Sequence, residues 1–331
     1  AIMRLASKCD VLTYEIELAN SVALKQLEAK GYPVRPTPET LRVIQNKFRQ
    51  KRFLKEHEIH VPDFDLVRSE NHLYELSDSY GLPLMVKACE DSYDGRGNFL
   101  VTSEGKIHEA FNYFPKREIM VEKFVEFTKE ISIMVARNPS GQIVSYPVAE
   151  NFHKNNILNT SIVPAGISHE TEEKAKRMAE RTMETLQGSG IFGIEMFVTK
   201  NDDVMINEIA PRPHNSGHYS NEACSISQFE QHLRAVLDLP LIKPELFCPA
   251  VMANILGNEG ISGPYVIHGL GRILSVPGVK LYLYGKKTTK PYRKLGHITA
   301  TGRTVNEALD RALKAKNGLE LEASRMVGAK T

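Results

Sequence analysis

Two groups of strand-like segments in the middle of the sequence restrict the possible folds more than any other feature. Residues 118–125, 129–137 and 141–150 carry the apolar and β-branched side chains typical of strands, and Asn-Pro-Ser-Gly between the last two is typical of a hairpin turn. A helix is predicted over 170–186, and a second hairpin follows over 191–210. These segments predict an antiparallel sheet interrupted by one long helix.

The segments on either side of this region alternate helices with strands. At the beginning, a buried strand over 10–16 leads into a helix over 20–31. A lone strand and helix cannot cover both faces of a parallel sheet, so we expect a missing amino-terminal piece of roughly 60 residues, the size of two β-α-β repeats. The other predicted elements are a long amphipathic helix over 36–59, strands over 63–68, 83–89 and 99–103, helices over 70–80, 105–114 and 226–239, strands over 250–256, 279–285 and 296–302, and a helix over 304–316.

The charge balance and the apolar content exclude several classes of protein. The 331 residues are 42% hydrophobic and 25% charged, as in an ordinary soluble protein, and 42 basic against 40 acidic side chains leave a formal charge of +2. Nucleic-acid surfaces show a basic excess, so we expect none in this chain, and the longest apolar runs are too short to span a membrane. The cysteines match no zinc spacing and predict reduced thiols in a cytoplasmic protein; they are Cys9, Cys89, Cys224 and Cys248.

Two carboxylates in the second hairpin form the first candidate site. Glu195 and Glu208 fall near opposite positions across a turn at residues 202 and 203, so their side chains can share one face. Like charges opposed in a sheet repel each other, and burial of both raises the pKa of each. A divalent cation removes this conflict, and Mg²⁺ is typically held by one or two carboxylates together with substrate phosphates. The alternative is a pair of solvated carboxylates at a strand end.

Arg212 and His214 follow Glu208 in a segment stiffened by two prolines. Their alternation points both side chains to one side, next to the predicted metal site. A guanidinium can grip a carboxylate or a bicarbonate by two hydrogen bonds, and a histidine there can bind the same anion or handle a proton. The alternative is a structural arginine that pairs with a strand-end carboxylate.

Two further segments are suited to phosphate groups. Backbone N–H groups of the glycine loop 92–98 can cradle phosphates within reach of the upstream Lys87, although such loops are more often plain turns. The segment 284–297 is typical of a solvated loop, but between strands it can also bind a substrate phosphate. Its basic residues are Lys286, Lys287, Lys290, Arg293 and Lys294.

The segment 121–130 is a weaker candidate for nucleotide binding. The backbone of residues 123–125 could bind an adenine, while a carboxylate of Glu122 or Glu130 accepts hydrogen bonds from ribose hydroxyls. The alternative is ordinary surface charge on an alternating strand.

Taken together, several segments resemble one family, the ATP-grasp enzymes that synthesise N5-carboxyaminoimidazole ribonucleotide in purine biosynthesis. The resemblance is strongest to the fungal form, which is fused to a carboxylase domain. PRPHNSGH and SQFEQHLRA distinguish this branch from other ATP-grasp enzymes. The matching segments, in the family's order, are SYDGRGN, VEKFVEFTKEIS, PVAENFHKNNIL, GIFGIEMFV, INEIAPRPHNSGHY, SQFEQHLRAVLDLPL and YRKLGHI.

The resemblance implies an α/β (α+β) ATP-grasp fold with a nucleotide cleft between two subdomains. It divides the chain into the remnant of an amino-terminal Rossmann-like domain over 1–36, an ATP-grasp domain over 37–240, and a carboxy-terminal β-rich domain with a tail over 241–331. It also implies that bicarbonate attacks the γ-phosphate of MgATP to give carboxyphosphate, whose carboxyl group passes to the exocyclic amine of aminoimidazole ribonucleotide.

The resemblance also implies a role for each matched residue. For ATP, Lys47 and Lys87 hold the phosphates, below Gly95 and Gly97. The adenine is bound by Glu122 and by the backbone of Lys123, Phe124 and Val125. Glu130 binds the ribose, and His153 lies close to the phosphates. Glu195 and Glu208 ligate Mg²⁺, with Asn207 assisting, and Arg212 and His214 hold bicarbonate near Lys294. Tyr93, Asp94 and Arg96 face aminoimidazole ribonucleotide, with Asp94 near its amine, while Lys286 and Arg293 bind its 5′-phosphate and Glu15 lies near its ribose.

Two other functions stay open. The first is another ATP-grasp ligase that acts on a ribonucleotide, such as a formate-dependent glycinamide ribonucleotide transformylase, or a biotin-carboxylase-like unit. The second is a non-catalytic ATP-binding fragment. The resemblance further implies a homodimer and, as a fused or separate partner, a carboxylase mutase domain.

Overall fold

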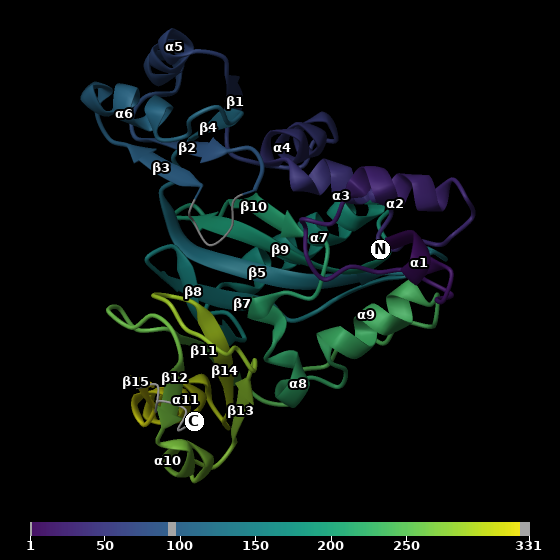
Figure 1. Cartoon of the computed structure of the whole chain (residues 1–331), viewed down its shortest axis with the longest axis vertical. Helices are drawn as coiled ribbons and strands as arrows, with labels where there is room; N and C mark the ends of the chain where they lie inside the picture. Colours follow the sequence, from purple (N-terminus) through teal and green to yellow (C-terminus); the bar gives the residue numbers. More distant parts are fainter. Residues whose placement is uncertain (1, 92–96, 325–331) are drawn as a thin grey trace, which may run out of the picture.

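The computed structural model describes residues 2–91 and 97–324 of the chain. In Figure 1 these residues form an upper lobe around a small sheet, a central part around a long sheet, and a lower carboxy-terminal part. The amino-terminal helices α1 (Ile2–Ala6), α2 (Ser21–Glu28) and α3 (Pro38–Gln45) lie beside the central part. No helix among the described residues is both long and apolar enough to cross a bilayer.

The upper lobe is an antiparallel sheet with helices on one face. Its strands are β1 (Phe64–Val67), β2 (Leu84–Ala88), β3 (Asn98–Val101) and β4 (Ile119–Lys123), in the spatial order β1-β4-β2-β3. Along β2 the side chains alternate, because Leu84 and Val86 pack under α5 (Glu70–Tyr80) and α6 (Ile107–Asn112), whereas Met85 and Lys87 face a cleft. The face of the small sheet opposite α5 and α6 is therefore the one that carries the lysine.

The central part is built on the long sheet. Its strands follow the order β10 (Val204–Ala210), β9 (Gly190–Thr199), β5 (Phe127–Arg137), β7 (Ala149–Lys154), β8 (Ile157–Val163), β11 (Ala250–Leu256), β14 (Lys294–Thr301) and β13 (Val279–Leu283), and β6 (Ile143–Ser145) pairs with β5. Helix α7 (His169–Leu186) buries Ala175, Ala179 and Met183 in a core with Ile133 and Ile194. Helices α8 (Ser220–Ala223) and α9 (Gln228–Val236) pack into a second core.

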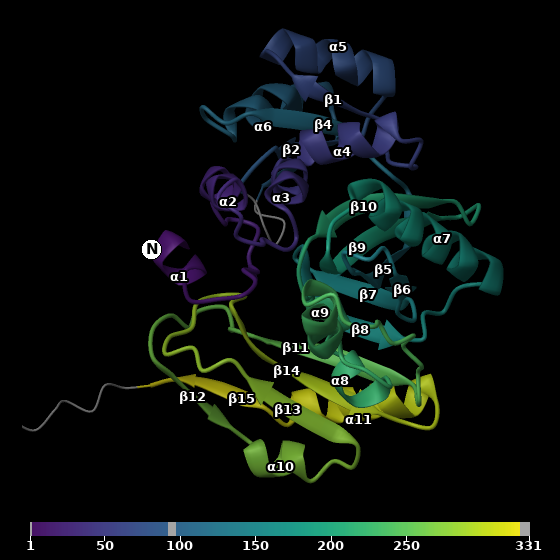
Figure 2. The ribbon, with the colours of Figure 1, turned by 90° about the vertical axis from the view of Figure 1, so that its right-hand side faces the viewer.

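The carboxy-terminal part continues this sheet. Strand β11 pairs with β8 on one side and with β14 on the other, so the two regions share one hydrogen-bonded ladder. Helices α10 (Leu270–Leu274) and α11 (Val305–Asn317) supply apolar side chains to the core there. A small ribbon of β12 (Tyr265–His268) and β15 (Glu320–Ala323) completes the lower part, as Figure 2 shows from the side.

Most of the predicted elements are confirmed. The helices predicted over 70–80 and 170–186 are α5 and α7, and the hairpin predicted over 191–210 consists of β9 and β10. The predicted strand over 10–16 is wrong, because the only strand-type pairing there among the described residues is an isolated bridge from Leu12 to Val34. The single strand predicted over 141–150 is split into β6 and the start of β7.

The long helix predicted over 36–59 is also wrong, since it is broken at Asn46 into α3 and α4 (Lys47–Glu56). The backbone of Asn46 leaves the helical region, with φ −111° and ψ 114°. Its side-chain oxygen accepts a hydrogen bond from the backbone N–H of Arg49 at 2.9 Å, as an N-cap residue does. Because of the break, Lys47 is the first residue of a new helix, and its side chain lines the cleft.

Candidate active site

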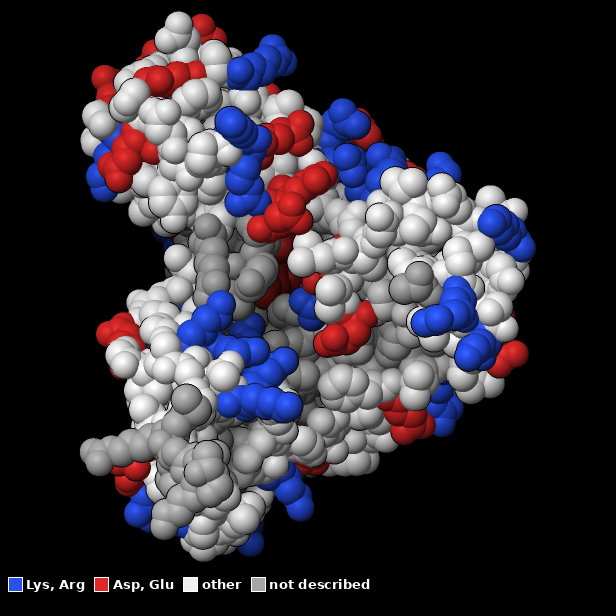
Figure 3. Space-filling model, in the orientation of Figure 1, with Lys and Arg blue, Asp and Glu red and all other residues white. Residues whose placement is uncertain are grey.

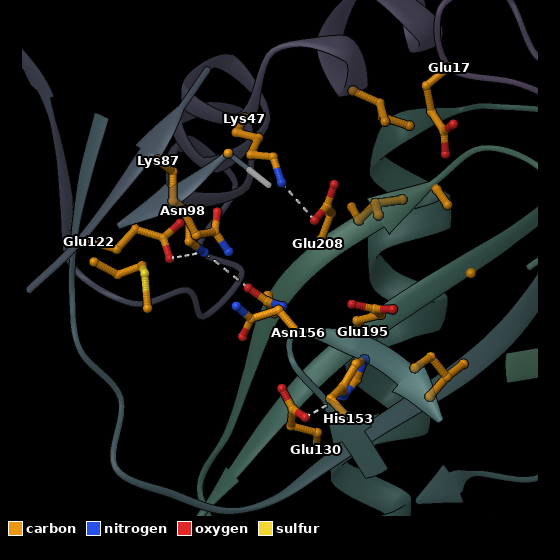
Figure 4. A pocket seen from close by; sticks show the side chains of 18 of the residues that line it. Glu17, Lys47, Lys87, Asn98, Glu122, Glu130, His153, Asn156, Glu195 and Glu208 are labelled. Carbon is orange, nitrogen blue, oxygen red and sulfur yellow. Dashed lines mark hydrogen bonds and ion pairs between the residues drawn. The ribbon is translucent and has the colours of Figure 1, made fainter. Parts of the chain in front are cut away.

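A cleft of about 1300 Å³ lies between the upper lobe and the long sheet. The space-filling view in Figure 3 shows the molecule hollowed there, with Lys and Arg side chains gathered below the hollow. The lining comes from distant parts of the chain, including residues 16–18, the start of α4, strands β2, β4, β9 and β10, and Lys294 at the start of β14. Figure 4 shows the charged side chains that meet inside it.

Glu195 and Glu208 lie opposite each other on β9 and β10, which confirms the predicted register. The pairing depends on a β-bulge, because Ile206 and Glu208 pair with consecutive residues of β9 and Asn207 is the extra residue between them. The bulge lets both Asn207 and Glu208 line the cleft, while Ile206 and Ile209 stay in the apolar core. Without it, strict alternation would send Glu208 to the core side together with Ile206.

Lys47 neutralises one of the two carboxylates. Its ammonium Nζ lies 2.9 Å from Oε2 of Glu208, and Figure 4 shows this ion pair at the edge of the cleft. The backbone N–H of Lys47 donates to the carbonyl of Cys89 at 2.8 Å, which ties the start of α4 to the end of β2. The helix break at Asn46 and this backbone hydrogen bond fix the position of the Lys47 ammonium group.

A second, more buried charge cluster lies between β2, β4 and α4. The ammonium of Lys87 lies 2.6 Å from Oε2 of Glu122 and 3.3 Å from Oδ1 of Asn207. Lys51, with 2% of its side chain exposed, donates to the carbonyl of Ile206 at 2.9 Å and lies 3.3 Å from Oε1 of Glu122. Burial disfavours the Glu122 carboxylate, but the nearby lysines outweigh burial and lower the pKa of Glu122 to about 2.

The electrostatic surroundings distinguish Glu195 from Glu208. Burial opposes the charge of Glu208, but the ammonium of Lys47 outweighs it and lowers the pKa of Glu208. At Glu195 burial dominates, and the carboxylates of Glu208 and Glu130 raise its pKa further, against the opposing effect of His153. Of the two carboxylates, Glu195 therefore has the surroundings that are less favourable to a negative charge.

These residues fit a magnesium ion. The carboxylates of Glu195 and Glu208 and the amide oxygen of Asn207 are hard oxygen ligands, which Mg²⁺ prefers. Within residues 2–91 and 97–324, no group of three or more His, Cys, Asp or Glu side chains is placed to hold a metal. The pair would thus supply part of a coordination shell, as in sites where nucleotide phosphates and water complete it.

The segment after β10 brings Arg212 and His214 beside this pair. Nε2 of His214 lies 3.5 Å from Oε1 of Glu195, and Nε of Arg212 lies 2.8 Å from Oε1 of Glu17. Both side chains line the cleft, as does Lys294. Burial, followed by the cationic groups of Arg212 and Lys294, holds the pKa of His214 well below its usual value, so the ring is neutral at pH 7.

The other end of the cleft carries the residues predicted for the nucleoside. Lys123, Phe124 and Val125, where the chain leaves the upper lobe, line it. Oε2 of Glu130 on β5 lies 2.5 Å from Nδ1 of His153 on β7, as Figure 4 shows. Burial would lower the pKa of His153, but the Glu130 carboxylate outweighs burial and raises it.

Two groups of predicted residues are absent from the described lining of the cleft. Tyr93, Asp94, Gly95 and Arg96 fall outside the described residues, whereas Gly97 lines the cleft. The described lining does not include the residues predicted for the ribose and the 5′-phosphate of the ribonucleotide, which are Glu15, Lys286 and Arg293. The guanidinium of Arg293 instead donates to the carbonyl of Thr288 at 3.0 Å.

Sequence reasoning also missed residues that shape the site. Glu17, which pairs with Arg212, lies in an irregular segment whose sequence carries no motif. Lys51 lies in a highly charged helix, where a buried lysine has no distinctive pattern. Only the three-dimensional packing distinguishes these side chains from ordinary surface charges.

Three family models match the chain. An ATP-grasp domain matches residues 52–229, a ribonucleotide synthetase preATP-grasp domain matches residues 1–45, and a phosphoribosylaminoimidazole carboxylase C-terminal domain matches residues 250–311. Together they cover most of the chain, and the ATP-grasp model alone includes both the upper lobe and strands β5 to β10 of the long sheet.

Curated relatives carry two kinds of name. Phosphoribosylaminoimidazole carboxylase of Candida glabrata is 42% identical over 97% of this chain, which spans only 57% of that longer protein. N5-carboxyaminoimidazole ribonucleotide synthase of Bacillus subtilis is 38% identical over 90% of this chain and 77% of its own length.

Solved structures agree with these relatives. The crystal structure of N5-carboxyaminoimidazole ribonucleotide synthetase from Thermotoga maritima is 44% identical, with a TM-score of 0.88 over 98% of this chain and 85% of that one. The Aspergillus clavatus synthase in complex with ADP and 5-aminoimidazole ribonucleotide is 34% identical, with a TM-score of 0.88 over 96% and 83% of the two chains.

Proposed function

The chain belongs to the ATP-grasp family and, within it, to the N5-carboxyaminoimidazole ribonucleotide synthases, and from this membership we propose that it carboxylates 5-aminoimidazole ribonucleotide in purine biosynthesis. ATP and bicarbonate are the co-substrates. A bicarbonate oxygen attacks the γ-phosphorus of ATP, ADP leaves, and carboxyphosphate forms. The exocyclic amine of the ribonucleotide then attacks the carboxyl carbon, phosphate leaves, and the amine gives up a proton.

The protein's contribution to this chemistry is positioning and charge neutralisation. Lys47 and Lys87 bind phosphate oxygens of ATP, and the buried Glu122 orients Lys87 through their 2.6 Å ion pair. The backbone at 123–125 takes the adenine, and Glu130 takes the ribose. Glu130 also holds His153, which the resemblance places close to the phosphates.

Glu195, Glu208 and Asn207 would hold Mg²⁺ at the phosphate end of the cleft. When bound, the ion would neutralise negative charge on the transferring phosphoryl group. Arg212 and His214 hold bicarbonate near Lys294, at the side of the carboxylate pair. Four of these residues, Asn207, Glu208, Arg212 and His214, come from the end of β10 and the segment after it, whereas Glu195 lies on β9 and Lys294 on β14.

The amino-acceptor side of the site draws on residues that the structure describes only in part. Asp94 acts near the amine, beside Tyr93 and Arg96. Lys286 and Arg293 with Lys294 bind the 5′-phosphate, and Glu15 is proposed near the ribose. The basic surface below the hollow in Figure 3 supports an anionic substrate entering from that side.

The observation that carries the proposal is the opposition of Glu195 and Glu208 next to Lys47 in the cleft. The test is phosphate release measured with ATP, bicarbonate and aminoimidazole ribonucleotide, each withheld in turn. We expect fast release only with all three present. Glu208→Ala should lower turnover about a hundredfold or more, because it removes one of the carboxylates that would hold Mg²⁺ at the transferring phosphate.

Glu184→Ala, at an exposed glutamate of α7, is the matched control and should keep full turnover. Release stimulated by glycinamide ribonucleotide in place of aminoimidazole ribonucleotide would identify another ligase. Binding of MgATP without bicarbonate-dependent phosphate release would identify a binding module. Full turnover in Glu208→Ala would remove the magnesium assignment.

A homodimer and a carboxylase partner belong to the same proposal. On α9 and just beyond it, Phe229, Leu233 and Leu237 follow one another at helical spacing and are exposed, which supports a second copy of the chain as their cover. Glu230 and Arg234 flank them, so an antiparallel pair of α9 helices brings opposite charges together. The carboxylase names of the longer fungal relatives support a carboxylase domain, fused or separate, as the consumer of the product.

A further inference from the structure

Two buried hydroxyl groups connect the centre of the long sheet to the ring of His214. Nδ1 of His214 lies 2.8 Å from Oγ of Ser216, which lies 2.7 Å from Oγ of Ser132. Ser216 and Ser132 are 0% and 1% exposed. Ser132 pairs with Glu195 across β5 and β9, so the hydroxyl chain starts beside the carboxylate pair. It reaches the imidazole at Nδ1, whereas Nε2 lies on the side of Glu195.

The direction of these hydrogen bonds follows from the donors. Ser132 donates to Ser216, which leaves the hydroxyl hydrogen of Ser216 available to donate to Nδ1 of His214. The backbone N–H of Ser216 lies 3.4 Å from the same nitrogen. A backbone N–H can only donate, and an N–H at Nδ1 would face it as a second donor. Nδ1 is therefore the accepting nitrogen, and the ring hydrogen lies on Nε2, on the side of Glu195.

Contacts other than the two serines also hold His214 in place. The buried amide of Gln228 accepts from the backbone N–H of His214 at 2.8 Å and donates to its carbonyl at 2.9 Å. On the sheet side, His214 packs on Gly193, where an added Cβ would lie 2.5 Å from the Cβ of His214. Backbone and side chain are thus fixed independently of the two serines.

We propose that Ser132 and Ser216 are positioning residues that keep the ring hydrogen of His214 on Nε2, so that His214 donates a hydrogen bond to the anion in the cleft and does not act as a base. The identity of that anion, bicarbonate or the carboxyphosphate formed from it, rests on the proposed function. The tautomer itself does not.

The tautomer is tested by long-range ¹H–¹⁵N correlation spectra of the ¹⁵N-labelled full chain without ligands, with His214→Gln used to assign the signal. We expect Nδ1 of His214 to resonate as an unprotonated ring nitrogen and Nε2 as a protonated one. The reverse pattern, or averaged shifts from a mixture of tautomers, would overturn the proposal.

The role of the serines is tested by Ser216→Ala and Ser132→Ala. In Ser216→Ala only the long 3.4 Å contact of the backbone N–H remains at Nδ1, so we expect nitrogen shifts that move toward averaged values. We also expect a drop of about tenfold in kcat/KM for bicarbonate, the loss expected for one hydrogen bond, with the KM for ATP unchanged. Ser132→Ala should show the same changes to a smaller extent. Wild-type nitrogen shifts in both variants would overturn the proposal.

Ser161→Ala is the matched control. Ser161 is 0% exposed and its hydroxyl donates to Asn151 at 2.7 Å, so the change also removes one buried serine hydrogen bond from the same sheet. It should keep both the spectrum and the bicarbonate kinetics. If the wild-type chain shows no bicarbonate-dependent phosphate release, the proposed function fails, whereas the tautomer is still decided by the spectra.

Discussion

The buried carboxylate of Glu122 has a lysine near each of its two oxygens. Glu122 is 3% exposed and meets Lys87 on one oxygen and Lys51 near the other. Buried ion pairs of this kind contribute little net stability, because the cost of removing both charges from water offsets their attraction. Their effect in this cluster is geometric, since they hold the Lys87 ammonium next to Asn207 at the cleft wall.

His232 gives a prediction for the pH dependence of folding. The ring is 6% exposed, its Nδ1 accepts from the backbone N–H of Ile191 at 3.1 Å, and burial lowers its pKa from 6.5 to about 4. Between these values the unfolded chain binds a proton at this ring and the folded chain does not, so the free energy of unfolding falls as the pH drops through this window. His232→Asn keeps an acceptor near Ile191 but cannot be protonated. Wild type should therefore lose up to about 3 kcal/mol more than the variant between pH 6.5 and 4, measured by urea unfolding.

Parallel stability curves for wild type and His232→Asn would contradict this prediction. Other histidines with lowered pKa values, His218 and His297 among them, are present in both proteins and cancel in the difference.

Residues at the site differ in how far sequence alone could predict them. Glu195 and Glu208 could be predicted as neighbours, because a short turn forces two strands of known length to pair. Ser132 and Ser216 could not, since a serine in a strand or a loop has no pattern that marks it as buried beside a particular histidine. Glu17 could not be predicted either, because only its contact with Arg212 in the folded chain marks it.

At the scale of secondary-structure elements, two local irregularities build the site. Periodicity favours one helix across 36–59, because the apolar positions continue through Asn46, and only the capping side chain of Asn46 marks the break. The bulge at Asn207 is likewise absent from the alternation pattern, which predicts a regular strand. The regular elements were predictable because their signals are local, whereas both irregularities depend on partners elsewhere in the fold.

Asn46 gives a prediction at this scale. Its amide nitrogen donates to Glu118 at 2.9 Å and to Glu90 at 3.1 Å, in addition to the cap on Arg49. Asn46→Ala should lower the free energy of unfolding by about 2 kcal/mol, from the lost cap and the lost buried hydrogen bonds. It should also weaken ATP binding, because the start of α4 positions Lys47. Urea unfolding and nucleotide titration measure the two effects.

Asn20→Ala is the control for capping alone. Asn20 caps α2 at an exposed site, where its side chain accepts from Ala23 at 2.9 Å. This variant should lose at most about 1 kcal/mol and keep its affinity for ATP. If Asn46→Ala binds ATP as tightly as Asn20→Ala does, the helix break has no part in nucleotide binding.

The whole molecule combines parts that no single segment encodes. The cleft takes side chains from residues 16–18 through Lys294, and the long sheet joins β8 to β11 across α7, β9, β10 and α9 in the sequence. The motifs that resemble the ATP-grasp family, taken in their order along the chain, predicted the fold class. The pairing of β8 with β11 could not be predicted in the same way, because long-range strand partners carry no local sequence signal.

The proposed homodimer is the prediction for the whole molecule. Leu233→Glu, at a side chain that is 55% exposed on α9, should shift the chain from dimer to monomer in sedimentation experiments, because it introduces a charge into the apolar contact. Leu313→Glu, at a leucine of α11 that is 45% exposed, should leave the dimer intact. A monomeric wild-type chain, or a dimer that tolerates Leu233→Glu, would rule out this interface.

The shared ladder of β8 and β11 determines how the molecule can be divided. A fragment ending at residue 240 would keep the ATP-grasp strands but leave one side of β8 without its neighbour, with unpaired amides beside apolar side chains. Exposed edges of this kind recruit strands from other molecules. Residues 250–256 thus cover the edge of β8 by hydrogen bonding to it. A soluble minimal fragment has to retain these residues or place charged residues along that edge.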